Sequence, residues 1–420
     1  MQRANSASPQ AATTDDARYT PYFLSSLSSG TIALVAFLFL LHPFPASTGI
    51  VFTAFDLADG FQRSAALNKT FAAVSYVVFL LAAATNCWLN FQALRHLINA
   101  TRSAGLAKVA APGQASSLHV VPLALSLNIL VISVISRTAF PVPEGAIQAL
   151  IPLGLLLVAI CTAATMLLLA NSLYRRLRTG RDSTSPPNNL HLASYALSLQ
   201  ALGVLACGRP CSAPAVSSAA MPIAHAIAVI AVLVSTVAIA QSITSIARYG
   251  VTLHNSGTFW LIVPVLTTQT IVFTAGKHPG GVLSGAASQI YSADNFVLHF
   301  WLLGTLVVQG VLFILCVILA SLHHLHRGQF DGTDEPDSGA FLISLPGVNF
   351  ALMIAYVLQT SLVPFQNPSF GTPTYLALSL LAFVAVAASI ASDVTLHPLV
   401  HTSRATRVSP GDLPATNSGG

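Results

Sequence analysis

The sequence predicts an all-α integral membrane protein, with about ten transmembrane helices that form five helical hairpins around a central axis. The chain has 420 residues, of which 54% are hydrophobic and only 7% are charged, whereas soluble domains average about 25% charged residues. Its mean hydropathy is +0.71. Ten apolar stretches reach the length of about 20 residues that a spanning helix needs. Every second stretch ends in a basic or histidine-rich cluster, which favours hairpins that all return to one side of a bilayer.

The ten apolar stretches define the predicted spans in chain order. They run over 22–43, 70–94, 117–138, 145–170, 191–208, 215–240, 257–276, 296–320, 340–362 and 374–395. Runs such as GLLLVAI over 154–160 are apolar on nearly every face, so they lack the alternation of a β-barrel strand. Only helices satisfy their own backbone hydrogen bonds in lipid, and each stretch is therefore expected to be helical. The fifth span is the weakest, because it is short and is interrupted by Ser194, Ser198 and Gln200.

The distribution of basic residues predicts the topology. If the N-terminus is cytoplasmic, 13 of the 18 Lys and Arg residues fall on the inner side and 5 on the outer side. Basic residues concentrate in cytoplasmic loops, so we expect both termini to be cytoplasmic in a multi-pass protein of the cell inner (plasma) membrane. The net charge of +5 is then a topology signal, and no nucleic-acid partner is expected.

The chain is expected to form one membrane domain flanked by two tails. Residues 21–402 make up the predicted ten-helix domain, and residues 1–20 and 403–420 are polar tails expected to be disordered and cytoplasmic. The first outer loop is long enough to hold a short interfacial helix. The first span lacks a small-residue cleavage site after a short apolar core, so a cleaved secretory signal is not expected.

The spans that start from the cytoplasm are the natural candidates to line a central space, because the others carry the basic anchors. Hydroxyls, amides and prolines in these odd-numbered spans supply the candidate pore-lining residues: Ser29, Thr31, Pro122, Ser126, Asn128, Ser198, Pro264, Thr268, Pro346 and Asn349. Pro264 and Pro346 fall well inside their spans, where a proline kinks a helix and frees a carbonyl. Polar side chains and prolines also serve helix packing, and Pro152 on the fourth span weakens the pattern.

Two further features would bear on a pore. Phe341 and Phe350 in the ninth span are candidate gates, since aromatic rings can plug a pore, although a phenylalanine in lipid is more often a packing residue. Arg137 at the outer end of the third span is a candidate pore-mouth charge, or else an interfacial anchor. The middles of the spans hold no Asp, Glu, Lys or Arg, which counts against a proton-coupled pump.

No cofactor, metal site or enzyme activity is predicted. No two histidines lie at matching depth for a bis-histidine haem. The HHLH run (His323, His324 and His326) is more typical of an interfacial helix end than of a metal site. Cys207 and Cys211 have C-x₃-C spacing rather than the redox C-x₂-C, and whether they form a disulfide stays open.

The segments YFLSSLSSGTIALVAFLFLLHP (Tyr22–Pro43) and TFWLIVPVLT (Thr258–Thr267), with the ten-span pattern, resemble the TsoY-like branch of the tellurite-resistance/dicarboxylate transporter and slow-type anion channel superfamily. The resemblance implies a five-helix pore made by the odd-numbered helices, a phenylalanine gate on the ninth, and a homotrimer. Near the gate position this chain reads SLPGVNF. Leu345 or Pro346 would stand where phenylalanine is expected, with Phe350 displaced, and this departure puts the family's gating mechanism in doubt.

Together these observations predict a membrane channel or transporter for small anions or organic acids. An uncharged, hydroxyl-lined pore with electropositive helix ends could pass anions without a high-affinity site. The alternative is a membrane anchor or accessory subunit of a redox or sulfur-oxidation system that has no transport activity. The lipid bilayer is the expected partner in either case.

Overall fold

The computed structural model describes residues 19–41, 52–105, 118–179, 188–249, 260–275, 296–327, 344–362 and 373–402. These residues form eleven α-helices and one π-helical turn, and they include no strand. The prediction of an all-α fold is therefore confirmed. The predicted tails at 1–20 and 403–420 lie outside the described residues, apart from the first two positions of the first helix.

Every predicted span corresponds to a helix. In chain order the helices are α1 (Tyr19–Leu41), α2 (Ala54–Arg63), α3 (Ala66–Ala104), α6 (Val120–Thr138), α7 (Glu144–Thr179), α8 (Asn188–Gly208), α9 (Pro214–Tyr249), α11 (Ile262–Ala275), α12 (Phe296–Arg327), α13 (Leu345–Val357), which continues as the π-helix η5 (Leu358–Leu362), and α15 (Pro373–Thr402). Eight are long and apolar enough to cross a membrane, and α11 and α13 are shorter apolar helices. The chain is therefore a multi-pass membrane protein by the hydropathy of its helices.

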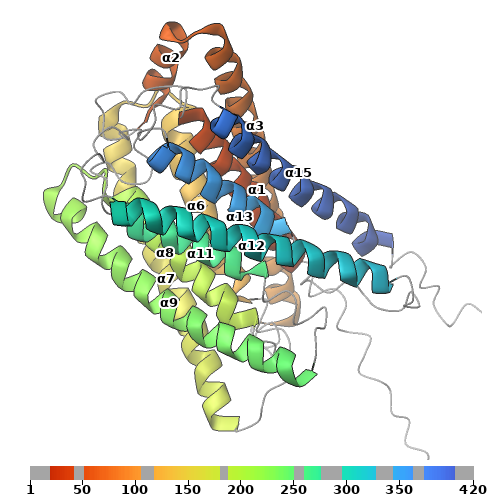
Figure 1. Ribbon diagram of the computed structural model, residues 1–420. Coiled ribbons are helices and arrows are strands. Elements are labelled where there is room, and N and C mark those ends of the chain that lie inside the picture. The colour runs from red at the N-terminus through yellow and green to blue at the C-terminus, as the bar shows by residue number, and fades with distance from the viewer. Residues whose placement is uncertain are drawn as a thin grey trace, which may run out of the picture.

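The short helix α2 lies between α1 and α3, in the loop where the sequence leaves room for one. Its start is fixed by a capping box: the Thr53 side chain accepts from the backbone N–H of Asp56, whose carboxylate in turn accepts from the Thr53 N–H at 2.8 Å. Leu57 is buried, whereas Phe55 is 61% exposed. The helix therefore packs against the protein with one side and exposes the other. It lies next to the start of α3 (Figure 1).

The helices form two rings, one inside the other. α1 packs on α6, α6 on α8, α8 on α11, α11 on α13, and α13 back on α1, which closes an inner ring of the odd-numbered spans. Each outer helix covers a seam of that ring, so that α3 contacts α1 and α6, α7 contacts α6 and α8, α9 contacts α8 and α11, and α12 contacts α11 and α13. α15 covers the last seam, between α13 and α1 (Figure 1).

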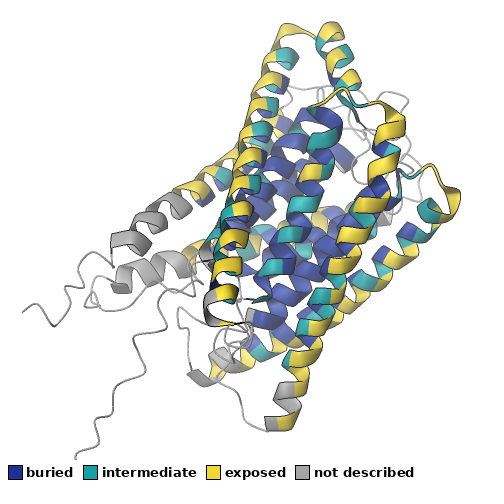
Figure 2. Cartoon of the chain, turned by 180° about the vertical axis from the view of Figure 1, so that it is seen from behind, coloured by how far each residue is buried: buried dark blue, intermediate teal, exposed yellow. Residues whose placement is uncertain are grey.

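Burial divides the helices in the same way (Figure 2). In the most apolar 18-residue stretch of each long helix, 83% of the residues of α1 and 100% of those of α8 are buried. The corresponding share in the outer helices is 17% to 28%. α6 is intermediate at 56%. The outer helices carry large exposed apolar side chains, such as Leu167, Phe300 and Phe383, each more than 70% exposed. Such a surface suits contact with the hydrocarbon of a bilayer and not with water.

Pro264 and Pro346 lie early in the described helices. α11 and α13 begin at Ile262 and Leu345, so both prolines lie in the first turns of these helices, and the residues that precede them in the predicted spans lie largely outside the described residues. The first N–H groups of a helix have no partner within the helix, so a proline there removes no bond. Pro122 is likewise the third residue of α6. Two helices of the outer ring, α7 and α9, have a proline well inside them, Pro152 and Pro222.

Candidate functional site: the axis of the inner ring

Tyr195 of α8 crosses the interior of the inner ring. Its hydroxyl donates to Oδ1 of Asn349 on α13 at 3.4 Å and also interacts with the Thr31 side chain of α1. α11 lies between α8 and α13 in the ring, and α6 lies between α8 and α1. A side chain that joins α8 to both must therefore reach across the centre. Tyr195 is fully buried and occupies the axis at this level.

A small apolar cavity lies inside the inner ring. Residues from all five inner helices line it: Leu34, Phe37 and Leu38 of α1, Leu130 and Val134 of α6, Leu202 and Ala206 of α8, Ile271 of α11, and Leu352 of α13. Leu202 lies two turns beyond Tyr195 on α8, so the cavity is displaced from the tyrosine toward the C-terminal end of that helix. The cavity measures about 30 Å³, close to the ~30 Å³ share of one water in the liquid. Its lining is entirely apolar.

Most of the polar residues predicted to line a pore donate to their own helix. Thr31 Oγ1 donates to Leu27 O, Ser126 Oγ to Pro122 O, Ser198 Oγ to Ser194 O, Thr268 Oγ1 to Pro264 O, and Asn349 Nδ2 to Leu345 O, at 2.6–3.0 Å. Ser29 makes similar bonds to Ser25 and Ser26. Asn128 accepts from Sγ of Cys87 on the outer helix α3. Thr31 and Asn349 belong to the Tyr195 cluster; for the others a lining role stays a prediction.

Other polar side chains join neighbouring helices. Ser28 of α1 and Ser344, just before α13, are 2.6 Å apart, and Gln269 of α11 donates to Ser198 of α8 at 2.7 Å. Thr267 of α11 lies 2.8 Å from Gln309 Oε1 of α12. Since a buried polar group costs free energy unless it is paired, these bonds fix the positions of the helices around the axis.

The structure describes one of the two predicted gate residues, Phe350. Phe341 lies outside the described residues. The Phe350 ring stacks on Phe313 of α12 with centroids 5.4 Å apart, and its edge lies over Gly310. In this conformation the Phe350 side chain points from α13 toward the outer ring. Tyr195, which does cross the axis, was not singled out from the sequence; its only signal there is a large hydroxylated ring among small side chains in SYALS.

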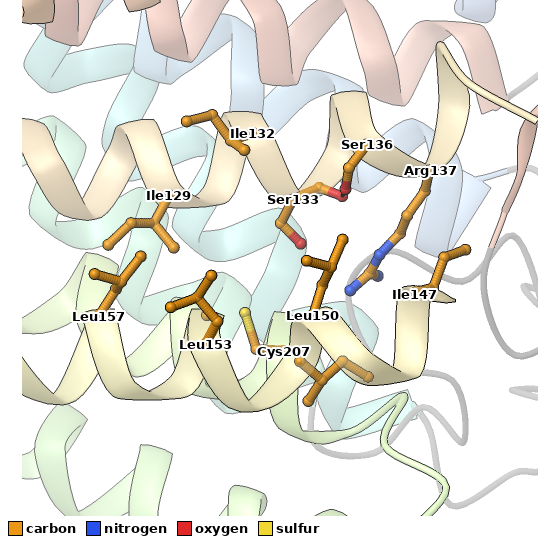
Figure 3. A pocket seen from close by; sticks show the side chains of 12 residues that line it. Ile129, Ile132, Ser133, Ser136, Arg137, Ile147, Leu150, Leu153, Leu157 and Cys207 are labelled. Carbon is orange, nitrogen blue, oxygen red and sulfur yellow. Dashed lines mark hydrogen bonds between the residues drawn. The ribbon is translucent and has the colours of Figure 1, made fainter. Parts of the chain in front are cut away.

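Arg137 is buried between α6 and α7, and it is not among the residues that line the axial cavity. Its guanidinium lies in a groove walled by these two helices, and Nη2 donates to Ala206 O of α8 at 3.4 Å (Figure 3). The pore-mouth role of Arg137 stays a prediction.

The described residues contain no group of three or more His, Cys, Asp or Glu side chains placed to hold a metal ion. His191 of α8 bonds to Ser242 of α9 at 3.0 Å, and the His225 ring stacks on Phe273. The side chains of the HHLH run lie outside the described set. Cys207 and Cys211 are both free thiols, with Cys207 buried in α8 against the groove.

Comparisons of the chain with protein-family models, with curated proteins and with solved structures find no match. The function is therefore inferred from the geometry of the two rings.

Proposed function

We propose that the inner ring is a conduit for small anions or organic acids, and that the structure holds it in a closed state. In this proposal all ten apolar helices cross the membrane, as five hairpins around the axis, in the inner (plasma) membrane with both termini cytoplasmic. The protein acts without a cofactor and is not an enzyme. A homotrimer would accord with the family that the sequence resembles.

The observation that carries the proposal is the closed ring of five inner helices, in which each helix packs on the next and α13 packs back on α1. The five outer helices cover the seams of this ring, so the inner helices are shielded from lipid. Internal repeats arranged around a common axis are a recurring feature of transporters.

The charge of the inner ring favours anions over cations. The described parts of α1, α6, α8, α11 and α13 contain no Asp, Glu or Lys, and Arg137 is their single formal charge. A path without carboxylates lacks the negative charges that concentrate cations in many pores, and hydroxyl and amide groups can donate to an anion. The resemblance to slow-type anion channels supports the same substrate class.

A second candidate function is a membrane anchor or accessory subunit of a redox or sulfur-oxidation system. The observation that favours it is the Tyr195 side chain that reaches across the inner ring, with an apolar cavity inside the ring that has room for only about one water. Flux measurements and partner capture distinguish the two functions.

The test is anion flux into proteoliposomes that contain the purified chain, measured for chloride, nitrate, sulfite and malate. We expect flux above protein-free vesicles for at least one anion, no flux of potassium, and a larger flux in the Tyr195→Ala variant. Absence of flux in both the wild type and a folded Tyr195→Ala variant would overturn the conduit. A stoichiometric soluble redox partner that co-purifies with the non-conducting chain would then support the anchor.

A further inference from the structure

We propose that the groove between α6 and α7 binds a phospholipid, with its phosphate on Arg137 and an acyl chain along the apolar floor. The proposal does not depend on transport, because the groove lies between the inner and outer rings and not on the axis. It requires only that the helices sit in a bilayer.

The groove is a built cavity of about 150 Å³, several times the ~30 Å³ that one water occupies in the liquid. α6 and α7 form its walls and Cys207 of α8 contributes to its floor (Figure 3). Gly154 lets α7 approach α8 here, since a Cβ at this position would lie 3.0 Å from the Cys207 sulfur. Except for Arg137 and two serines, the other side chains around the groove are apolar, which suits a hydrocarbon chain.

Arg137 has unused hydrogen-bonding capacity inside this groove. The residue is 4% exposed, its Nη2 makes one long bond of 3.4 Å, and its Nη1 is buried with no acceptor. Among the described residues no carboxylate forms an ion pair with it. A guanidinium carries five N–H donors, and a buried charge without a counter-ion is costly. A phosphate would supply both the charge and the acceptors, in the paired geometry that arginine favours.

The mouth of the groove opens on the surface that faces lipid. Ile132, Leu150 and Leu153 line the groove and are 48%, 49% and 53% exposed. These side chains are where an acyl chain would enter sideways from the bilayer.

The polar and apolar parts of the groove are spaced as in a phospholipid. Arg137 is the next-to-last residue of α6, at the end of the span where headgroups lie. Ile129 lies two turns deeper, about 12 Å along the helix axis. A free inorganic anion would pair with Arg137 but leave the apolar floor unfilled, whereas a phospholipid matches both parts.

The test measures lipid bound to the protein purified in mild detergent, by native mass spectrometry, with phosphatidylglycerol as the probe. We expect about one retained phospholipid per chain in the wild type. We expect Arg137→Gln to lower phosphatidylglycerol affinity at least tenfold, as loss of a hydrogen bond to a charged group would. The matched control is Arg63→Gln, since the Arg63 side chain is 79% exposed and already pairs with Asp59 at 2.8 Å.

Further measurements distinguish binding through the phosphate from binding through the acyl chains. Ser136→Leu narrows the groove but keeps Arg137, and we expect it to lower phosphatidylglycerol affinity without changing the fold. Glycerol phosphate tests the phosphate alone and diacylglycerol tests the chains alone, and each is expected to bind at least tenfold more weakly than phosphatidylglycerol.

A phosphatidylglycerol that carries a photoreactive acyl chain should label the groove-lining parts of α6 and α7 in the wild type. Labelling confined to other helices, or equal binding of glycerol phosphate and phosphatidylglycerol, would overturn the proposal. If Arg137→Gln does not fold, the Ser136→Leu variant and the labelling pattern decide it.

Discussion

In the proposed conduit, closure depends most directly on Tyr195. Its buried ring reaches across the inner ring of helices, and its hydroxyl donates to Asn349 of α13. These are two separable contributions, one from volume and one from a hydrogen bond. Substitutions that remove them one at a time test which of the two would hold the proposed conduit closed.

We expect Tyr195→Ala to raise anion flux at least about tenfold, equivalent to about 1.4 kcal/mol of barrier, because it empties the axis. It should also lower the free energy of unfolding by about 3–5 kcal/mol, as for other buried aromatic truncations. Tyr195→Phe keeps the ring volume, so its flux should stay near wild type, with a loss of stability of about 1–3 kcal/mol from the unpaired Asn349 oxygen. The measurements are proteoliposome flux and thermal unfolding.

The matched control is Tyr375→Ala, since Tyr375 is equally buried, at 1% exposed, but lies on the outer helix α15. It should lower stability without raising flux. Equal flux in the two alanine variants would show that flux reflects general loosening and that Tyr195 is not a plug.

At this scale the sequence predicts which residues are polar but not where they point. Thr31, Asn349, Ser126 and Thr268 all donate to carbonyls of their own helices, but only Thr31 and Asn349 also interact with Tyr195. A hydroxyl in a helix can donate to a carbonyl one turn back in any sequence context, so composition does not distinguish the two cases. Tyr195 escaped prediction because its partners lie 154 and 164 positions away in sequence, and only the closed ring brings them together.

At the scale of the helices, close approach depends on small residues at the crossings. A Cβ on Gly347 of α13 would meet the Ser389 hydroxyl and would lie 2.8 Å from the Ala385 carbonyl oxygen of α15. The backbone carbonyl cannot turn aside as a flexible side chain would. Gly347 is therefore the residue that lets α13 and α15 pack directly against each other.

We expect Gly347→Val to lower the free energy of unfolding by about 1–3 kcal/mol, the usual cost of overpacking. Gly304→Ala on α12 is the control, because a Cβ there meets nothing within 4 Å. That change should leave stability equal or raise it by about 0.5–1 kcal/mol through the better helix propensity of alanine. Thermal unfolding in detergent measures both. A stable Gly347→Val protein would show that α15 can shift to accept the side chain.

Helix positions were predictable because hydropathy and basic ends mark them along the chain. The bounds of α1 and α8 differ from the predicted spans by only a few residues. The positions of Pro264 and Pro346 within their helices were not predictable, since hydropathy alone does not mark where a helix begins within an apolar stretch. The weakness of the fifth span also has a physical reason: α8 contacts protein on every side, so it needs no apolar surface for lipid.

At the scale of the whole molecule, the length of α3 constrains the topology. α3 has 39 residues, about 58 Å at 1.5 Å per residue, so it is longer than the bilayer is thick. Its two ends therefore lie on opposite sides of the membrane. The basic-residue pattern predicts in addition that the end near Arg102 is cytoplasmic and that α2 is outside.

We expect a cysteine at Arg63 to react with an impermeant thiol reagent on intact cells, and a cysteine at Arg102 to react only after permeabilisation. Both positions are exposed, so access to the reagent and not burial decides the outcome. The five native cysteines are replaced beforehand to remove background labelling. The reverse labelling pattern would invert the orientation and place both termini outside.

The complete enclosure of α8 has a consequence for how the chain enters the membrane during synthesis. Its mean hydropathy of 1.5 is the lowest of the eight long apolar helices, whereas the next helix, α9, reaches 2.5. A segment leaving the translocon is sorted by its own apolarity, and Ser194, Ser198 and Gln200 weaken that of α8. We expect α8 to integrate poorly when the nascent chain stops before α9, and efficiently once α9 follows it, which insertion assays with engineered glycosylation sites would detect. The helix that carries the plug of the ring would then depend on its neighbour to become a membrane helix at all.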